Sequence, residues 1–208
     1  MKTSLVRLAS VALIAAFAGS AMAALTPYSQ SFEGLTISDP GALANDGWKV
    51  FGNVFTSGGG YLYGYGPFPA PNGGNGFSAI GTGEGGVAQG NQYLNVYSDY
   101  NNGDHANGNL IEANVFQEQV ISGADLGQTV QFSFDYKAAA GAGPAGSTTA
   151  KAFFKVLNPN SGFSLVAFPT LETTGASSSS WASGSISLTI DSSWTGHILQ
   201  FGFMNTAT

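Results

Sequence analysis

The sequence predicts an all-β protein, an antiparallel β-sandwich of the jelly-roll type. Apolar and polar residues alternate strictly in several segments, and a period of two is typical of a strand with one buried face. Gly, Asn, Ser and Pro gather between these segments, as they do in turns and surface loops. After residue 23 no segment shows a helical period, and no repeat of fixed length indicates a propeller or a solenoid. About ten short strands joined by such loops therefore predict one sandwich domain.

The clearest expected strand is VQFSFDYK, where Val130, Phe132, Phe134 and Tyr136 share one face. We expect this face to be buried, because the residues between them are polar or charged. The other expected strands are rich in β-branched and aromatic residues, which favour sheets. In chain order they are PYSQSFE (27–33), GWKVFGNVF (47–55), QYLNVYS (92–98), AKAFFKVL (150–157), FSLVAF (163–168), SISLTI (185–190) and HILQFGFM (197–204).

The N-terminus has the pattern of a cleaved signal peptide. Lys2 and Arg7 accompany an apolar stretch, residues 8–17, that is too short to span a bilayer. Ala21 and Ala23 stand at the small-residue positions of a cleavage site, so we expect residues 1–23 to be removed. The alternatives are a membrane anchor or an N-terminal core helix. We therefore expect a secreted or cell-surface protein with one sandwich domain, residues 24–208, and no transmembrane segment after cleavage.

The composition excludes several classes of protein. Residues 24–208 hold four lysines, no arginine and twelve acidic residues, which gives a net charge of −8. Such a chain is a poor ligand for nucleic acid and for anionic membranes. It has no cysteine, so Cys-ligated zinc, iron–sulfur clusters and thiol catalysis are excluded. An exported chain without disulfides must gain its stability from a buried core or from a metal. We also expect the protein to be a monomer.

Four segments carry a resemblance to a known fold family. They are SFEGL (31–35), GW (47–48), QVISGADLGQTVQFSFDYKA (119–138) and SSWTGHILQFGF (192–203). With these segments the chain resembles the galactose-binding-domain-like jelly roll of many carbohydrate-binding modules. It is also similar in style to exported bacterial proteins that carry a PEP-type sorting tail, although no such tail is present. The family normally closes with a strand carrying an Asp-Asn pair. Because the sequence stops at FGFMNTAT, we expect a C-terminal truncation that lacks this closing strand.

The resemblance implies a calcium site. In the family, a structural calcium commonly takes a carboxylate from the opening strand, and Glu33 of SFEGL stands at that position. An acidic chain rich in Asn and Gly offers the hard oxygen ligands that calcium prefers. The alternative is that Glu33 is an ordinary surface acid. The segment DYNNGD (99–104) is similar to the opening of an EF-hand, but its glycine and its twelfth position do not fit, so we interpret it as a solvated loop.

The stretch YLYGYGPFPAPNGG (61–74) contains the candidate ligand-binding residues. Tyr61, Tyr63 and Tyr65 have the same parity, so in a regular strand all three project from one face. A row of rings can pack against the apolar face of a sugar while nearby amides and carboxylates bind its hydroxyls. The alternative is a tyrosine face that packs into the core. The polar candidates are Asn72, Asn75, Asn95, Asp99 and Asn101.

Catalytic groups are sparse. The chain has two histidines, His105 and His197, and no nucleophile elbow, HExxH motif or phosphate-binding loop. A glycosidase needs only two suitably spaced carboxylates, for which Glu84, Glu112 and Glu118 are candidates without a flanking motif.

The leading hypothesis is an exported, non-enzymatic β-sandwich that recognises an extracellular carbohydrate or exopolysaccharide. The second is a structural or matrix protein of the surface without a small ligand, and the third is a secreted glycan-active enzyme. An exposed row of tyrosines would favour binding, and a buried row would favour the structural role. Two carboxylates that face each other across a groove would favour the enzyme.

Overall fold

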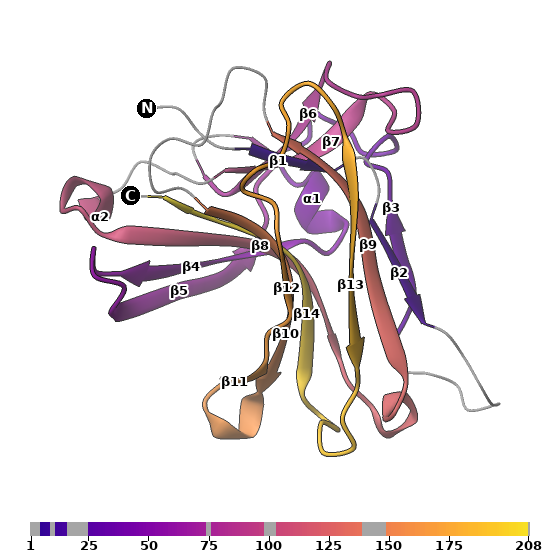
Figure 1. The fold of residues 1–208 in the computed structure, drawn as a ribbon, viewed down its shortest axis with the longest axis vertical. Coiled ribbons are helices and arrows are strands. Elements are labelled where there is room, and N and C mark those ends of the chain that lie inside the picture. The colour runs from indigo at the N-terminus through magenta and orange to yellow at the C-terminus, as the bar shows by residue number, and fades with distance from the viewer. Residues whose placement is uncertain are drawn as a thin grey trace.

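The period-two segments form the strands of an antiparallel β-sandwich, so the predicted all-β fold is confirmed (Figure 1). The computed structural model describes residues 5–8, 11–15, 25–73, 76–97, 103–138 and 149–207. Strands account for about half of the described residues. They form two seven-stranded sheets, in which every strand pair is antiparallel.

The main sheet has the strand order β11-β10-β14-β8-β4-β5, and β12 pairs with β10 beside β11. Its long central strands β8, β10 and β14 are paired over most of their length. The strands are β4 (Lys49–Phe55), β5 (Tyr61–Pro69), β8 (Leu110–Val120), β10 (Thr149–Asn158), β11 (Ser164–Ala167), β12 (Thr170–Glu172) and β14 (Ile198–Ala207).

The second sheet has the order β3-β2-β9-β1-β7-β6, and β13 pairs with β9. The predicted signal peptide includes β1 and β2 and otherwise lies outside the described residues, so its cleavage stays a prediction. The strands are β1 (Leu5–Leu8), β2 (Val11–Ala15), β3 (Tyr28–Gln30), β6 (Ser78–Thr82), β7 (Gln92–Tyr97), β9 (Thr129–Ala138) and β13 (Ala182–Thr189).

The helices are single turns in the connections between strands. They are α1 (Ala42–Asn45), α2 (Gly103–Ala106) and the 3-10 turns η1 (Gly123–Asp125) and η2 (Pro159–Ser161). Within the described residues, none of the helices has the length and apolar character needed to cross a bilayer.

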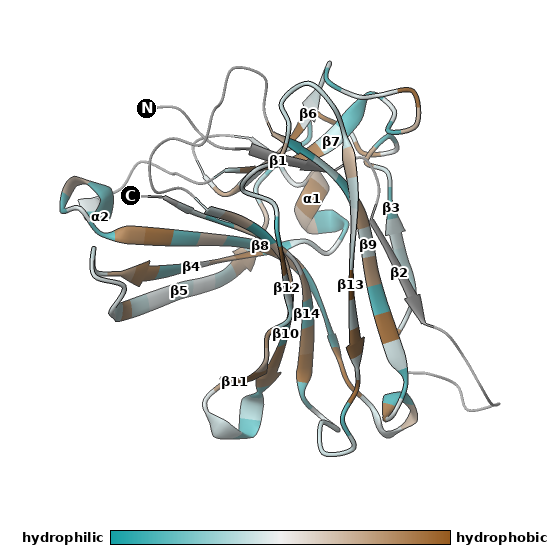
Figure 2. Ribbon diagram, in the orientation of Figure 1, coloured by the Kyte–Doolittle hydropathy of each residue, from teal (hydrophilic) through white to brown (hydrophobic). Residues whose placement is uncertain are grey.

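The core lies between the two sheets and combines aliphatic side chains with a group of packed aromatic rings. Figure 2 shows β9 banded in apolar and polar positions, as its alternation predicts. Phe132 and Phe134 of β9 are almost fully buried, and the Phe132 ring centroid lies 5.4 Å from that of Phe201 and 5.1 Å from that of Phe203. These two residues come from β14, so the rings join the two sheets. Burying each aromatic side chain contributes about 1.5–3 kcal/mol to the free energy of unfolding.

The main sheet is folded sharply on itself, toward the face that points away from this core. Lys155 of β10 lies opposite Gln200 of β14, which lies opposite Glu118 of β8. Glu112 stands further along β8, and in a flat strand it would be about 20 Å from Glu118 at ~3.3 Å per residue. Lys155 Nζ nevertheless lies 3.3 Å from Glu112 Oε1, so the two ends of β8 approach each other. Figure 1 shows the result, with β4 and β5 running to the left and β10 and β11 running downward.

Gly202 of β14 stands at this bend. In register it lies between Phe116 of β8 and Phe153 of β10. A Cβ atom at Gly202 would lie 2.2 Å from the carbonyl oxygen of Val115 and 2.7 Å from the Cα of Phe116. The absence of a side chain therefore allows the backbones of β8 and β14 to approach closely where the sheet folds.

Candidate functional site

The bend gives the outer face of the main sheet a floor of apolar side chains. Phe116, Phe153 and Met204 form a small cluster separate from the sandwich core, and Phe51 packs against it. Phe116 and Phe153 are 1% and 0% exposed, although they project away from the core. Phe168, whose ring centroid lies 6.2 Å from that of Phe153, and Lys155 cover Phe153 on this outer side. We call this surface, formed by β4, β5, β8, β14 and β10, the concave face.

A polar network crosses this floor. Lys155 Nζ donates to Asn114 Oδ1 at 2.7 Å and to Glu112 Oε1 at 3.3 Å. The amide groups of Asn53 and Asn114 donate to the same Glu112 oxygen at 2.9 and 3.0 Å. The Lys155 ammonium also lies 4.8 Å from the ring centroid of Phe153 and 5.1 Å from that of Phe168. Lys155 therefore bridges the two arms of the bent sheet and covers the rings beneath it.

The network changes the ionisation of both partners. Burial is the largest influence on the pKa of Glu112 and raises it, but the charge of Lys155 and the hydrogen bonds from Asn114, Asn53 and Lys155 together hold the pKa below its ordinary value. Burial lowers the pKa of Lys155, and the charge of Glu112 opposes this shift. Glu112 is thus an ionised acceptor of hydrogen bonds.

The concave face is balanced in charge. Lys49 Nζ lies 2.5 Å from Glu118 Oε1, and Gln200 donates to Glu118 Oε2 at 3.1 Å. At the β10 side of the face, Lys151 pairs with Glu172 at 3.6 Å. Lys49, Lys151 and Lys155 are three of the four lysines that follow residue 23. Residues 24–208 therefore place three of their four positive charges on one face, where each ammonium group meets a carboxylate.

Of the three predicted tyrosines, the structure places only Tyr61 on the concave face. Val54 pairs with Tyr63, but Phe55 pairs with Tyr61, so Leu62 is an extra residue in β5. This β-bulge reverses the parity of Tyr61, and the expectation that all three share a face is wrong for this residue. The Tyr61 ring lies 5.7 Å from the ring of Phe55, whose side of β4 also carries Phe51 and Asn53. Tyr61 is 61% exposed, at the rim of the face.

Tyr63 and Tyr65 lie on the opposite side of β5. Tyr65 packs on the sandwich core, with its ring 6.1 Å from that of Phe77. Tyr63 is half-exposed, lies beside Tyr65 and donates from its hydroxyl to Asp104 Oδ2 at 2.5 Å. This hydrogen bond is the main cause that raises the pKa of Tyr63 and lowers the pKa of Asp104. The three rings therefore do not form a row. Tyr61 lies at the exposed rim, Tyr63 contacts α2, and Tyr65 packs on the core.

The two predicted polar ligands that the structure describes, Asn72 and Asn95, do not join the tyrosines. The Asn72 side chain donates to the backbone oxygens of Ile37 and Asp39 and accepts from the Ile80 N–H, so it holds loops together. Asn95 lies in β7 of the second sheet. The remaining polar candidates, Asp99, Asn75 and Asn101, lie outside the described residues.

Glu33 anchors the start of β7. Its Oε1 accepts from the backbone N–H groups of Asn91 and Gln92 at 2.6 and 2.5 Å, and the Gln92 side chain donates to the Glu33 carbonyl oxygen. Across the described ranges, no three His, Cys, Asp or Glu residues are grouped so that they could hold a metal. His197 is buried at the start of β14, and His105 lies in α2. A calcium ligand at Glu33 stays a prediction.

We expect the change Glu33→Gln to lower the free energy of unfolding by about 1 kcal/mol, since a neutral amide oxygen is a weaker acceptor than a carboxylate. Thermal melts with calcium and with chelator measure this effect and test the metal together. A gain in melting temperature with calcium that disappears in Glu33→Gln would support a calcium site. Equal melting temperatures with calcium and with chelator would assign Glu33 to loop anchoring alone.

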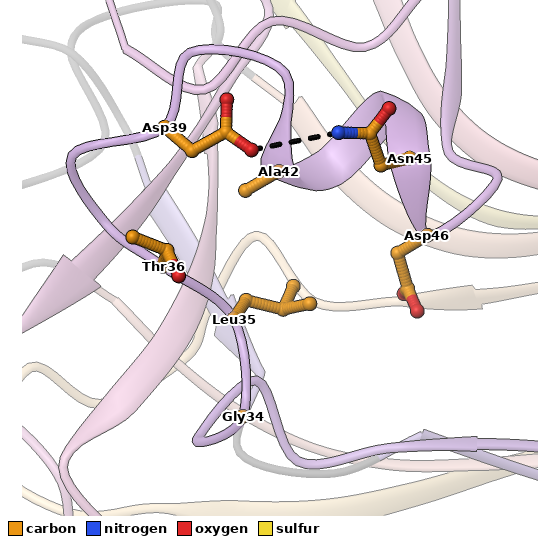
Figure 3. Close-up of a pocket in the computed structure, with 7 residues that line it drawn as sticks. All are labelled: Gly34, Leu35, Thr36, Asp39, Ala42, Asn45 and Asp46. Carbon is orange, nitrogen blue, oxygen red and sulfur yellow. Dashed lines mark hydrogen bonds between the residues drawn. The ribbon is translucent and has the colours of Figure 1, made fainter.

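A shallow hollow lies beside α1, away from the concave face (Figure 3). Its volume is about 250 Å³, and it is lined by the loop that follows β3 and by α1. Asp39 accepts from the Asn45 side chain across it, and Asp46 Oδ2 accepts from the hydroxyl of Tyr28 and from the indole of Trp48. These carboxylates therefore serve the local fold.

Sequence reasoning missed Lys155, Asn114 and Asn53 as site residues. A signal was present in AKAFFKVL, where Phe153 stands between Lys151 and Lys155 on the parity opposite to the core. A phenylalanine that stands between two lysines on the side of a strand facing away from the core indicates that other side chains, such as lysine stems, cover this side as well. Glu112 and Glu118, for which the sequence shows no shared motif, both lie on the concave face.

Comparisons of the chain with protein-family models, with curated proteins and with solved structures find no match.

Proposed function

We propose that this protein recognises a neutral polysaccharide through the concave face, as an exported non-enzymatic module. The observation that supports the proposal most is the arrangement on that face, where exposed rings at the rim, Tyr61 and Phe168, flank a central network of amide, ammonium and carboxylate groups. Sugars need this combination, because their C–H faces pack on rings while their hydroxyls exchange hydrogen bonds with polar groups.

Charge favours a neutral ligand over an anionic one. The formal net charge of the chain is −6, and the lysines of the concave face are already paired with Glu118, Glu172 and Glu112. A polyanion would meet repulsion from the whole molecule and no free ammonium group on this face. The hydroxyl groups of a neutral glycan can join the existing network as donors and acceptors without adding charge.

The enzymatic alternative has one observation in its favour, which is that Glu112 and Glu118 share the concave face. A glycosidase, however, needs one carboxyl group that is kept protonated to act as general acid. The pKa of Glu112 is lowered, and Glu118 accepts from Lys49 and from Gln200. Glu112 is therefore held as a carboxylate, and Glu118 is engaged by Lys49 and Gln200, so binding is the better interpretation of the face.

Affinity electrophoresis on a panel of glucans, mannans and galactans tests the proposal. The intact protein should be retarded by at least one neutral polysaccharide, and Tyr61→Ala should weaken the binding about tenfold, the equivalent of ~1.4 kcal/mol for one ring. Tyr63→Ala is the control, because it removes a tyrosine ring that is 46% exposed from the other side of β5. Equal losses in both variants would exclude the concave face, and no retardation on any gel would contradict the function.

A further inference from the structure

The β5 edge of the main sheet has no partner strand in the described part of the chain. In the strand order β5 is the terminal strand, and β4 is the neighbour with which it pairs. Edge strands expose backbone N–H and C=O groups that can pair with another chain, and natural proteins commonly protect such edges with charged residues or prolines. β5 has prolines only in its second half, at Pro67 and Pro69, so Tyr61–Gly66 has neither a proline nor a charge, and the bulge at Leu62 is the protective feature of this half.

This half of the edge is also apolar. Tyr61, Leu62 and Tyr63 are 61%, 46% and 46% exposed, and Phe68 further along the strand is 51% exposed. These side chains project on both sides of the sheet, because the bulge at Leu62 separates Tyr61 from Tyr63. A chain that pairs with this edge would therefore find apolar contacts above and below the new strand pair.

We propose that the β5 edge pairs with β5 of a second copy of this chain, antiparallel and around a two-fold axis. The absence of charged side chains along this edge favours a second copy as the partner. Two molecules of an acidic protein repel each other over most of their surface, but residues 61–73 contain no charged residue. Antiparallel pairing of identical strands uses the same surface on both molecules, which is the commonest form of homodimer. The two-fold axis stands perpendicular to the sheet, so both concave faces point the same way.

The area of the patch limits the strength of this dimer. An aromatic side chain carries roughly 150–250 Å² of surface, so the four half-exposed side chains supply roughly 400 Å² for each copy. A stable interface of standard size buries about 800 Å² for each partner. The paired backbone edges bury some further surface, but not enough to reach this area. The dimer should therefore be weak, with a dissociation constant in the micromolar range, and its population should depend on protein concentration.

Sedimentation velocity over a range from about 5 to 500 μM tests the proposal, a range that brackets a micromolar dissociation constant. The wild-type protein should shift from monomer to dimer as its concentration rises. Leu62→Lys places a charge in the apolar first half of the edge and should raise the dissociation constant roughly tenfold or more, while the melting temperature stays unchanged. Val120→Lys is the matched control, because Val120 is an apolar residue at the end of β8 that is 60% exposed, against 46% for Leu62.

Each other outcome contradicts the proposal. A wild-type protein that stays monomeric throughout the range would overturn it. A dimer that survives Leu62→Lys but is lost in Leu165→Lys would place the contact at β11, the opposite edge of the sheet, where Leu165 is also half-exposed. Glycan binding by a protein that stays monomeric would leave the proposed function intact, so the two proposals fail separately.

Discussion

Replacing Gly202 by alanine is expected to destabilise the protein by about 3 kcal/mol, the upper end of the range for overpacking a well-packed site. The new Cβ would lie 2.2 Å from the carbonyl oxygen of Val115 and 2.7 Å from the Cα of Phe116. Both atoms belong to the backbone of β8, so the overlap cannot be relieved by a change of side-chain rotamer. Relief requires β8 and β14 to separate at the bend, with loss of hydrogen bonds on both sides. Urea denaturation measures the change.

The matched control is Gly175→Ala. No heavy atom lies within 4 Å of a Cβ at Gly175, and its backbone does not need the left-handed region. Alanine there should be neutral or should stabilise by about 0.5 kcal/mol, because it reduces the freedom of the unfolded chain. If both variants had the same stability, the close approach of β8 and β14 at Gly202 would be wrong.

Replacing Lys155 by methionine is expected to lower the free energy of unfolding by about 3–5 kcal/mol, the usual loss when one partner of a buried ion pair is removed. Methionine keeps much of the volume above Phe153 and Phe168 but leaves the Glu112 carboxylate without its counter-charge. The double variant Lys155→Met with Glu112→Gln should recover most of this loss, since no uncompensated charge remains. The two single changes and the double change form a thermodynamic cycle that isolates the interaction of the pair.

The same pair predicts a dependence of stability on pH. The folded-state pKa of Glu112 lies below its ordinary value, so the folded protein binds this proton less readily than the unfolded chain. The contribution of Glu112 is therefore fully present above the ordinary carboxyl pKa of about 4.3 and is lost as the pH falls through the lowered folded-state value. Lys155→Met should remove part of this acid-side dependence. An unchanged dependence would assign it to other carboxylates.

The fold was accessible from sequence because its signal is local. Alternation in VQFSFDYK predicts the buried face of β9, and Val130, Phe132 and Phe134 are buried as expected. The site was not accessible because its contacts are long-range. Lys155 and Glu112 are 43 residues apart, and they meet only because the sheet bends between the ends of β8. Alternation with a period of two identifies a strand but does not show where the strand bends. Gly202 stands at the bend, but the alternation does not distinguish its position.

The tyrosines show a second limit of sequence reasoning. Parity counting assumes a regular strand, and β5 contains an extra residue at Leu62. A bulge needs no particular side chain, so nothing in YLYGYG distinguishes a bulged strand from a regular one. The side of the sheet on which Tyr61 projects therefore depends on how β5 pairs with β4, and the sequence of β5 alone does not specify this pairing.

The bulge at Leu62 also shapes how this protein can change during evolution. Deletion of this one codon would remove the bulge and make Tyr61 and Tyr63 consecutive residues of a regular strand. Because consecutive residues of a strand project to opposite sides, Tyr61 would stay opposite Phe55 on the concave face and Tyr63 would stay opposite Val54. Loss of one residue at this point of β5 should therefore leave the rim ring in place, and homologues with and without the bulge should keep this tyrosine on the same face.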